Sequence, residues 1–170
     1  MNERKYIVIS PHVDDLLVGN FLLCKANLVY KLISTFAYSE NYNRTREEED
    51  ISCCKELGIE YSMEIPDLTL DSKKIYMLPS PDSLHPEHRA VTGFMNFLGM
   101  MYKKPCVEKL EFGYYSTDMK ESWVRNLPTE LAKEKKEWLE KYYPSQKDLW
   151  LSDKKYFLFE GQCFLLKGGD

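Results

Sequence analysis

Two polar clusters in this chain carry side chains that bind metal ions and transfer protons. Segment 11–15 (Pro-His-Val-Asp-Asp) follows the apolar run 6–9, and segment 85–88 (His-Pro-Glu-His) follows the apolar run 75–78. Together the two clusters contain all three histidines of the chain. Imidazole and carboxylate are the usual protein ligands of a catalytic zinc ion, which takes three of them and keeps one position open. The two clusters can supply such a set.

The spacing within each cluster suits hydrolysis. His85 and His88 are three residues apart across an expected helix start, which puts them on roughly the same side of the first turn. Adjacent Asp14 and Asp15 point in different directions in a turn, so one can hold a metal while the other faces the metal-bound water. The metal lowers the pKa of that water and polarises a carbonyl, and the second carboxylate removes the proton. Spacing alone does not choose among amide, ester and phosphate substrates.

Each motif also has a plainer interpretation. An Asp-Asp pair is typical of a helix N-cap, where carboxylates accept the free N–H groups. A single His-x-x-His occurs in many proteins that bind no metal. Two such clusters, both directly after expected strands and together holding every histidine, favour a site.

Around these clusters, short apolar runs alternate with amphipathic segments along the chain. This pattern indicates an α/β fold, whose strands and helices must position the clusters. Helices are expected over 15–27, 44–57, 86–103 and 129–143, and strands over 6–10, 29–36, 59–65, 75–78, 107–115 and 157–166. In an open parallel sheet, ligands bind beyond the carboxyl ends of the strands. Both clusters therefore belong on that rim, in a single domain spanning residues 1–170.

Composition narrows the function classes. The chain has 170 residues, of which 44% are hydrophobic and 29% charged, and a net charge of −4 without a basic stripe, which argues against nucleic-acid binding. No apolar run approaches the roughly 20 residues of a membrane span, and residues 1–5 do not resemble a signal peptide. The five cysteines are therefore expected to be reduced thiols in a cytoplasmic protein, with Cys53 and Cys54 at partly buried helix positions.

The two histidine clusters resemble the motifs of a known family. Segments 11–15 and 85–91 (His-Pro-Glu-His-Arg-Ala-Val) are similar to those of the LmbE/PIG-L family of zinc-dependent N-deacetylases, which typically read Pro/Ala-His-Pro-Asp-Asp-Glu and His-Pro-Asp-His. The likeness extends over most of the chain. Supporting matches are Arg46 and Glu49 before Leu57-Gly58, Lys135 or Lys136 with Tyr143, Ser145 and Gln146, and Phe159-Glu160 in the closing strand.

The resemblance implies a Rossmann-like three-layer fold with a mostly parallel sheet, and a role for each matched residue. His12, Asp15 and His88 would hold one zinc ion per chain, or another divalent metal. Asp14 would be the general base that deprotonates the zinc-bound water, and His85 would stabilise the tetrahedral intermediate or protonate the leaving amine. Family members remove acetyl or related acyl groups from amino sugars and glycoconjugates, so a small-molecule or glycoconjugate substrate is expected.

This chain departs from the family pattern in three ways. Val13 stands where the family has proline, at a position that is not a ligand. Leu16 stands where the family has glutamate, which removes an outer hydrogen bond of the kind that is worth about 10–100-fold in metal affinity or activity. The chain is also shorter than most relatives, so the loops that shape the substrate pocket can differ.

Other residues have two open interpretations each. Arg44 or Arg46 could hold a substrate phosphate or hydroxyl, or form a solvated helix start with residues 47–49. Asp82 could contact substrate or fix the tautomer of a site imidazole, or simply form a turn. Aromatic residues that could stack on a sugar, or pack in the core, are Tyr114, Tyr115 and Trp123; Gln146 is expected to orient a loop near the site.

Two rival functions use the same residues. A hydrolase of a phosphoester or another amide would often bind two metals about 3.5–4 Å apart. A carbohydrate-binding relative that has lost turnover would keep the fold, an idea that Leu16 and the short length motivate. A homo-oligomer is compatible with the sequence.

Overall fold

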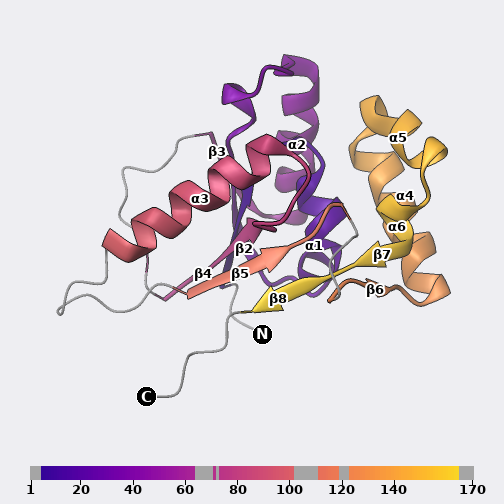
Figure 1. Cartoon of the computed structure of the whole chain (residues 1–170). Coiled ribbons are helices and arrows are strands. Elements are labelled where there is room, and N and C mark those ends of the chain that lie inside the picture. Colours follow the sequence, from indigo (N-terminus) through magenta and orange to yellow (C-terminus); the bar gives the residue numbers. More distant parts are fainter. Residues whose placement is uncertain (1–4, 64–70, 72, 102–110, 119–122, 165–170) are drawn as a thin grey trace.

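The computed structural model describes residues 5–63, 71, 73–101, 111–118 and 123–164. Its centre is a six-stranded sheet of order β3-β2-β1-β4-β5-β8 (Figure 1). Its strands are β1 (Tyr6–Ser10), β2 (Val29–Ser34), β3 (Glu60–Ser62), β4 (Ile75–Pro79), β5 (Glu111–Tyr115) and β8 (Gln162–Phe164). Strands β3, β2, β1, β4 and β5 run parallel, and β8 pairs antiparallel with β5. This is the α/β, Rossmann-like architecture that was expected.

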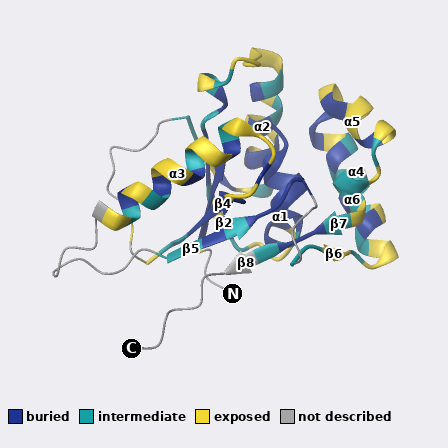
Figure 2. Cartoon of the chain, viewed as in Figure 1, coloured by how far each residue is buried: buried dark blue, intermediate teal, exposed yellow. Residues whose placement is uncertain are grey.

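Helices cover both faces of the sheet and make the fold three-layered. Helices α1 (Asp15–Lys25) and α2 (Arg44–Leu57) lie on one face, and α3 (Pro86–Met101) lies on the other. Three further helices, α4 (Thr129–Tyr142), α5 (Lys147–Ser152) and α6 (Lys155–Leu158), pack beside α1, α2 and one another. Successive side chains of β1 alternate between the faces: Val8 lies in the core under α1, α2 and α4, whereas Ile9 packs toward α3. Figure 2 shows that the central strands are buried between these layers.

Local signals set the bounds of α2 where they were expected. The side chain of Asn43 accepts hydrogen bonds from the N–H groups of Thr45 and Arg46, and Gly58 ends the helix with a φ of 65°. Cys53 and Cys54 are fully rather than partly buried, in the same core as Cys24, and all three are free thiols. Burial raises the pKa of Cys53 to about 12, which keeps that thiol protonated and unreactive.

The strand expected over 157–166 is wrong in its first residues and is divided in the rest. Residues 157–158 end α6, after which β7 (Phe159–Glu160) pairs with β6 (Arg125–Asn126), and β8 pairs with β5. The chain changes partner at Gly161, where a Cβ would lie 2.8 Å from the Cα of Val124. A short apolar run does not distinguish strand from helix by periodicity, so the sequence alone did not reveal this division. The expected strand and helix residues 64–65, 102–103, 107–110 and 165–166 lie outside the described residues.

Among the residues that the structure describes, none of the helices has the length and apolar character of a membrane span.

Candidate metal centre

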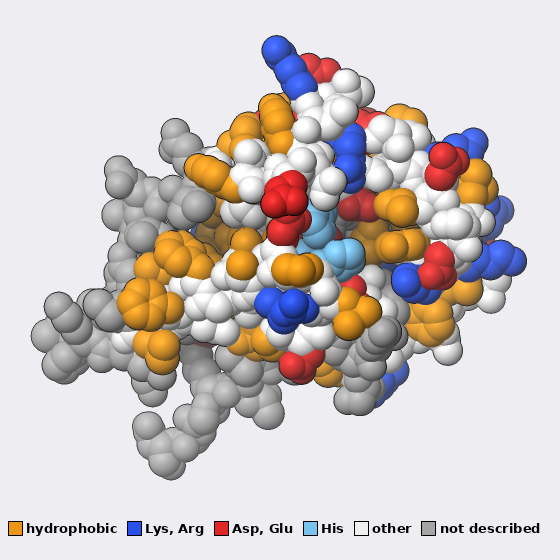
Figure 3. Space-filling view, turned by 45° about the horizontal axis from the view of Figure 1, so that its top comes forward, with side chains coloured by type: hydrophobic (Ala, Val, Ile, Leu, Met, Phe, Trp, Pro, Cys, Tyr) orange, Lys and Arg blue, Asp and Glu red, His pale blue; other side chains and the backbone are white. Residues whose placement is uncertain are grey.

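The two histidine clusters meet where the strand order reverses. Chain connections run from β1 outward to β2 and β3 on one side, and from β4 to β5 on the other. This reversal leaves a crevice beyond the carboxyl ends of β1 and β4, the usual ligand site in open α/β sheets. His12 follows β1 directly, and His88 lies in the first turn of α3 after β4. Figure 3 shows the histidines together on this face of the molecule.

Three side chains converge with the spacing of metal ligands. His12 Nδ1 lies 2.9 Å from His88 Nε2, which lies 3.3 Å from Asp15 Oδ2; His12 Nδ1 and Asp15 Oδ2 are 4.0 Å apart. Ligand atoms about 2.0–2.2 Å from a tetrahedral zinc ion would be roughly 3.4 Å apart. The His12, Asp15 and His88 group can therefore hold a metal ion.

Hydrogen bonds behind these ligands fix their orientation. His12 Nε2 contacts the Glu87 carboxylate, whose other oxygen accepts a 2.9 Å hydrogen bond from Ser39 Oγ. The backbone N–H of His12 donates to Asp15 Oδ2 at 2.8 Å. A ligating histidine typically has such a carboxylate on its outer nitrogen. Leu16 packs in the core, and the carboxylate that contacts His12 belongs to Glu87.

The outer nitrogen of His88 faces two hydroxyl groups. Ser83 Oγ lies 3.1 Å and Thr117 Oγ1 3.4 Å from His88 Nδ1, and all three residues are buried. A donating His88 Nδ1–H leaves Nε2 free for a metal. The neighbours of both imidazoles thus favour the tautomers that a metal site needs.

The electrostatics of the His12, Asp15 and His88 group favour a bound positive charge. Burial by itself would raise the pKa of Asp15, but the nearby charge of His88 and its hydrogen bond outweigh burial and lower that pKa. Burial likewise opposes the charged form of His88, yet Asp15 raises the pKa of the imidazole above its ordinary value. A positive charge is therefore favoured between these side chains, as a proton or as a metal ion.

Asp14 has a strained backbone and a side chain that does not cap the helix. Its φ of 96° lies in the left-handed region, which few residues other than glycine adopt. It occupies the N-cap position of α1 without a side-chain capping bond, so the plain N-cap interpretation of this residue is wrong. Its carboxyl group is buried beside the metal group, where burial and then the charge of Asp15 raise its pKa. Such strain is typical of functional positions.

Asp14 and His85 both line a cavity of about 230 Å³ next to the ligand group. The wall also includes Arg46, whose guanidinium lies 5.3 Å from the centre of the Phe36 ring. When the Gln146 amide is turned so that its oxygen faces Arg46, that oxygen accepts hydrogen bonds from the guanidinium. The contact of Gln146 is thus with a side chain of the cavity, whereas the sequence predicted a role in orienting a loop. Arg46 is therefore part of the cavity, whereas Arg44 is exposed and pairs with Glu48.

His85 stands on the open side of the cavity, and its partner is Asp118. His85 Nε2 lies 3.5 Å from Asp118 Oδ1, and the N–H of Leu84 donates to Asp118 Oδ2 at 2.6 Å. Burial and then the nearby His88 lower the pKa of His85, while Asp118 opposes them. Asp82 is exposed and its N–H donates to Ser80 Oγ in a turn, so it is Asp118 that contacts the imidazole.

Several contributors to the site were not identified from the sequence: Ser39, Ser83, Glu87, Thr117 and Asp118. Thr117 and Asp118 lie two and three residues after the end of β5, which the sequence correctly placed at residue 115. Because ligands bind beyond the carboxyl ends of parallel strands, this strand end could have indicated both residues as members of the site. The aromatic residues considered for stacking do not line this cavity. Tyr115 is buried and its hydroxyl donates to the carbonyl of Ile9, and Tyr114 donates to Asn96 Oδ1.

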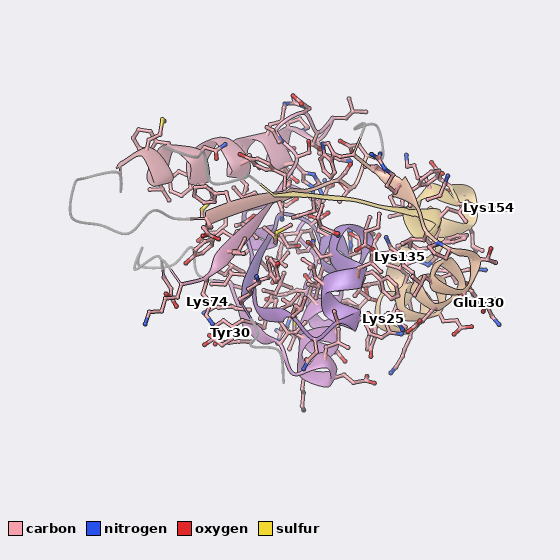
Figure 4. The ribbon with its side chains drawn as sticks, turned by 90° about the horizontal axis from the view of Figure 1, so that it is seen from below. Lys25, Tyr30, Lys74, Glu130, Lys135 and Lys154 are labelled. Atoms are coloured by element: carbon pink, nitrogen blue, oxygen red, sulfur yellow. The ribbon has the colours of Figure 1, made fainter. Side chains whose placement is uncertain are left out.

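Three side-chain contacts join residues that are distant in sequence and connect the late part of the chain to elements near the site. Arg46 contacts Gln146, Glu49 accepts two hydrogen bonds from Ser145, and Lys135 lies 3.2 Å from Glu160 Oε2. Lys135 also donates to the carbonyls of Val18 and Phe159, and so connects α4 to α1 and β7 (Figure 4). The late part of the chain is therefore tied to the helix that begins at the metal group.

No protein-family model and no curated protein sequence matches this chain. Among solved structures, it is similar to the conserved protein TT1542 from Thermus thermophilus, with a TM-score of 0.59 and 16% identity over 98% of this chain and 96% of that one. It is also similar to GalB, the 4-carboxy-2-hydroxymuconate hydratase from Pseudomonas putida, with a TM-score of 0.53 and 11% identity over 98% of both chains. At these identities the likeness shows the fold.

Proposed function

We propose that this protein is a metal-dependent hydrolase that removes an acetyl or related acyl group from the nitrogen of an amino sugar or glycoconjugate. The observation that carries the proposal is one arrangement: His12, Asp15 and His88 converge, and the strained Asp14 lies beside them in the same cavity. A ligand group, a separate carboxylate and a separate imidazole are the parts that metal-assisted amide hydrolysis needs.

Each side chain has a defined task in this proposal. A bound divalent ion supplies Lewis acidity, which lowers the pKa of a water molecule and polarises the acyl carbonyl. The Asp14 carboxylate accepts the proton of the attacking water, because it lies at the cavity wall without capping α1. His85, on the open side, donates a hydrogen bond to the carbonyl oxygen or a proton to the leaving amine. Arg46 provides a positive charge for a hydroxyl or phosphate of the substrate.

The LmbE/PIG-L resemblance supports the choice of an N-acyl bond. Its two histidine motifs supply every member of the proposed centre, and its weaker matches contact one another as Arg46–Gln146, Glu49–Ser145 and Lys135–Glu160. Imidazole with carboxylate suits zinc, although iron, cobalt and nickel use the same donors. The free thiols of Cys24, Cys53 and Cys54 favour a reducing, cytoplasmic location.

The test combines metal content with acyl release. We expect about one zinc ion per purified chain by mass spectrometry, and release of acetate or a longer acid from a panel of N-acyl amino sugars that a chelator abolishes. Asp14→Asn should keep the metal and lose at least about 100-fold in kcat, because only the base is removed. His88→Ala should lose both metal and turnover, whereas the exposed Asp148→Asn should change neither.

Each other outcome points to a different function. Near wild-type turnover of Asp14→Asn would show that the proposed base is wrong. A metal-to-protein ratio near two, with phosphoester cleavage, would favour a two-metal hydrolase. Failure to bind metal even after zinc is added back would overturn the catalytic proposal and leave a binding protein.

A further inference from the structure

A second cavity, of about 280 Å³, opens beside the metal centre and is mostly apolar. Its walls include Ile9 and Pro11 at the end of β1, Ile33 from β2, and Val91, Phe94 and Met95 from α3. Figure 3 shows hydrophobic side chains flanking the histidines on this face. Tyr38 and Phe94 line the cavity and remain 71% and 43% exposed, so an apolar ligand would remove large aromatic surfaces from water.

The two cavities share one border, the pair of Glu87 and His12. Glu87 lines the apolar cavity together with Ser39, and its carboxylate contacts His12, which lines the polar cavity. Pro11, at the wall of the apolar cavity, is covalently joined to His12. His12 and Asp15 line the polar cavity together with Arg46 and His85, and the apolar cavity adjoins this group across the Glu87–His12 pair.

This division matches the two halves of an N-acyl substrate, which diverge from the carbonyl carbon. We propose that the apolar cavity binds the acyl chain, and that the preferred substrates carry a medium-length chain rather than acetyl; this inference rests on the proposed function. The hydroxyl-rich amine half then occupies the polar cavity, where Arg46 and Asn41 can hydrogen-bond to it. The opposite arrangement would place most of the sugar hydroxyls against apolar side chains such as Ile33 and Val91, where they would lose hydrogen bonds to water, which is costly.

The size of the cavity sets the length of the chain. A cavity of about 150 Å³ holds one benzene molecule. The cavity of about 280 Å³ therefore holds a chain of roughly eight to ten carbon atoms. Each methylene that leaves water on binding is worth roughly threefold in affinity.

The experiment measures binding separately from turnover. The full-length, zinc-loaded Asp14→Asn protein is titrated calorimetrically with N-octanoylglucosamine and with N-acetylglucosamine. The octanoyl compound has six more methylenes than the acetyl compound, so we expect it to bind about 700-fold more tightly if all six leave water, and at least about 30-fold more tightly if half of them do. Ala90→Phe, which places a ring in the apolar cavity, should remove most of this difference. Ala26→Phe adds the same ring at an exposed site outside the cavity and should leave the difference in affinity unchanged.

Phe94→Ala provides a second variant in case the first does not fold, and should also weaken octanoyl binding. The inference is overturned if both compounds bind equally, or if Ala90→Phe and Ala26→Phe bind the octanoyl compound alike. Tight octanoyl binding without acyl release by the wild type would keep the cavity assignment and overturn the proposed function. Acetate release without any preference for chain length would support the proposed function and overturn the assignment of the apolar cavity to the acyl chain.

Discussion

The carboxylate of Glu87 holds one nitrogen of His12, while the other nitrogen of the same ring faces Asp15 and His88. Glu87 and His12 are 75 residues apart in the chain and belong to different histidine clusters. The second cluster therefore provides one member of the candidate metal-binding group and also orients the imidazole from the first.

Glu87→Gln should weaken zinc binding about 10–100-fold, because a neutral amide orients and polarises His12 less than a carboxylate does. Competition with a chromogenic chelator measures the affinity. Glu48→Gln, an exposed position on α2, is the matched control and should bind zinc like the wild type. Unchanged affinity in Glu87→Gln would mean that this contact does not support a bound metal.

Asp118→Asn should lower kcat roughly tenfold, because Asp118 lies 3.5 Å from His85. The variant should retain the metal, because Asp118 is not one of the three proposed ligands and acts on His88 only through its charge. Asp118 opposes the influences that lower the pKa of His85, so its loss should lower that pKa further. The limb of the pH–rate profile that reports His85 should then move to lower pH. Asp82→Asn is the control, since Asp82 is exposed in a turn; an identical effect of the two variants would count against the His85–Asp118 pairing.

Asp50 should make the protein less stable as pH rises. Its carboxyl is buried, accepts a 2.8 Å hydrogen bond from Tyr143, and has no partner for Oδ2 among the described residues. Burial raises its pKa from 3.8 to about 8. The folded state therefore holds a proton that the unfolded state releases near pH 4, so stability falls between about pH 4 and pH 8, by at most about 1.4 kcal/mol per pH unit.

Asp50→Asn keeps the acceptor for Tyr143 and removes the titration. Urea unfolding of the wild type and this variant from pH 5 to pH 9 should show a flatter dependence for the variant, and higher stability at pH 8. Asp148→Asn should follow the wild type. A wild-type stability that does not fall across this range would contradict the assignment.

Lys135→Met should destabilise the fold by about 3–5 kcal/mol, because it leaves the buried Glu160 carboxylate without its cation. The neighbouring Lys136 forms a partly exposed pair with Glu140, so Lys136→Met should cost less than about 1 kcal/mol. Chemical denaturation measures both. Equal effects of the two substitutions would show that the buried pair does not hold the late part of the chain.

The sequence alone determined the features that depend on neighbouring residues. Asn43 and Gly58 mark the ends of α2 through local hydrogen bonds and backbone preference, so its bounds were predictable. The two histidine clusters were expected at one edge because the carboxyl ends of parallel strands share that edge, and the structure brings His12, Asp15 and His88 together there.

Only the tertiary structure decided the contacts between side chains that are far apart in the chain. The choice of Asp118 over Asp82 as the neighbour of His85, and the division between β7 and β8, depend on which strand ends lie beside one another. The apolar cavity likewise exists only because β1, β2 and α3 enclose it. Residue type and local spacing specify what a side chain can do, but its partners are set by packing, which no local pattern encodes.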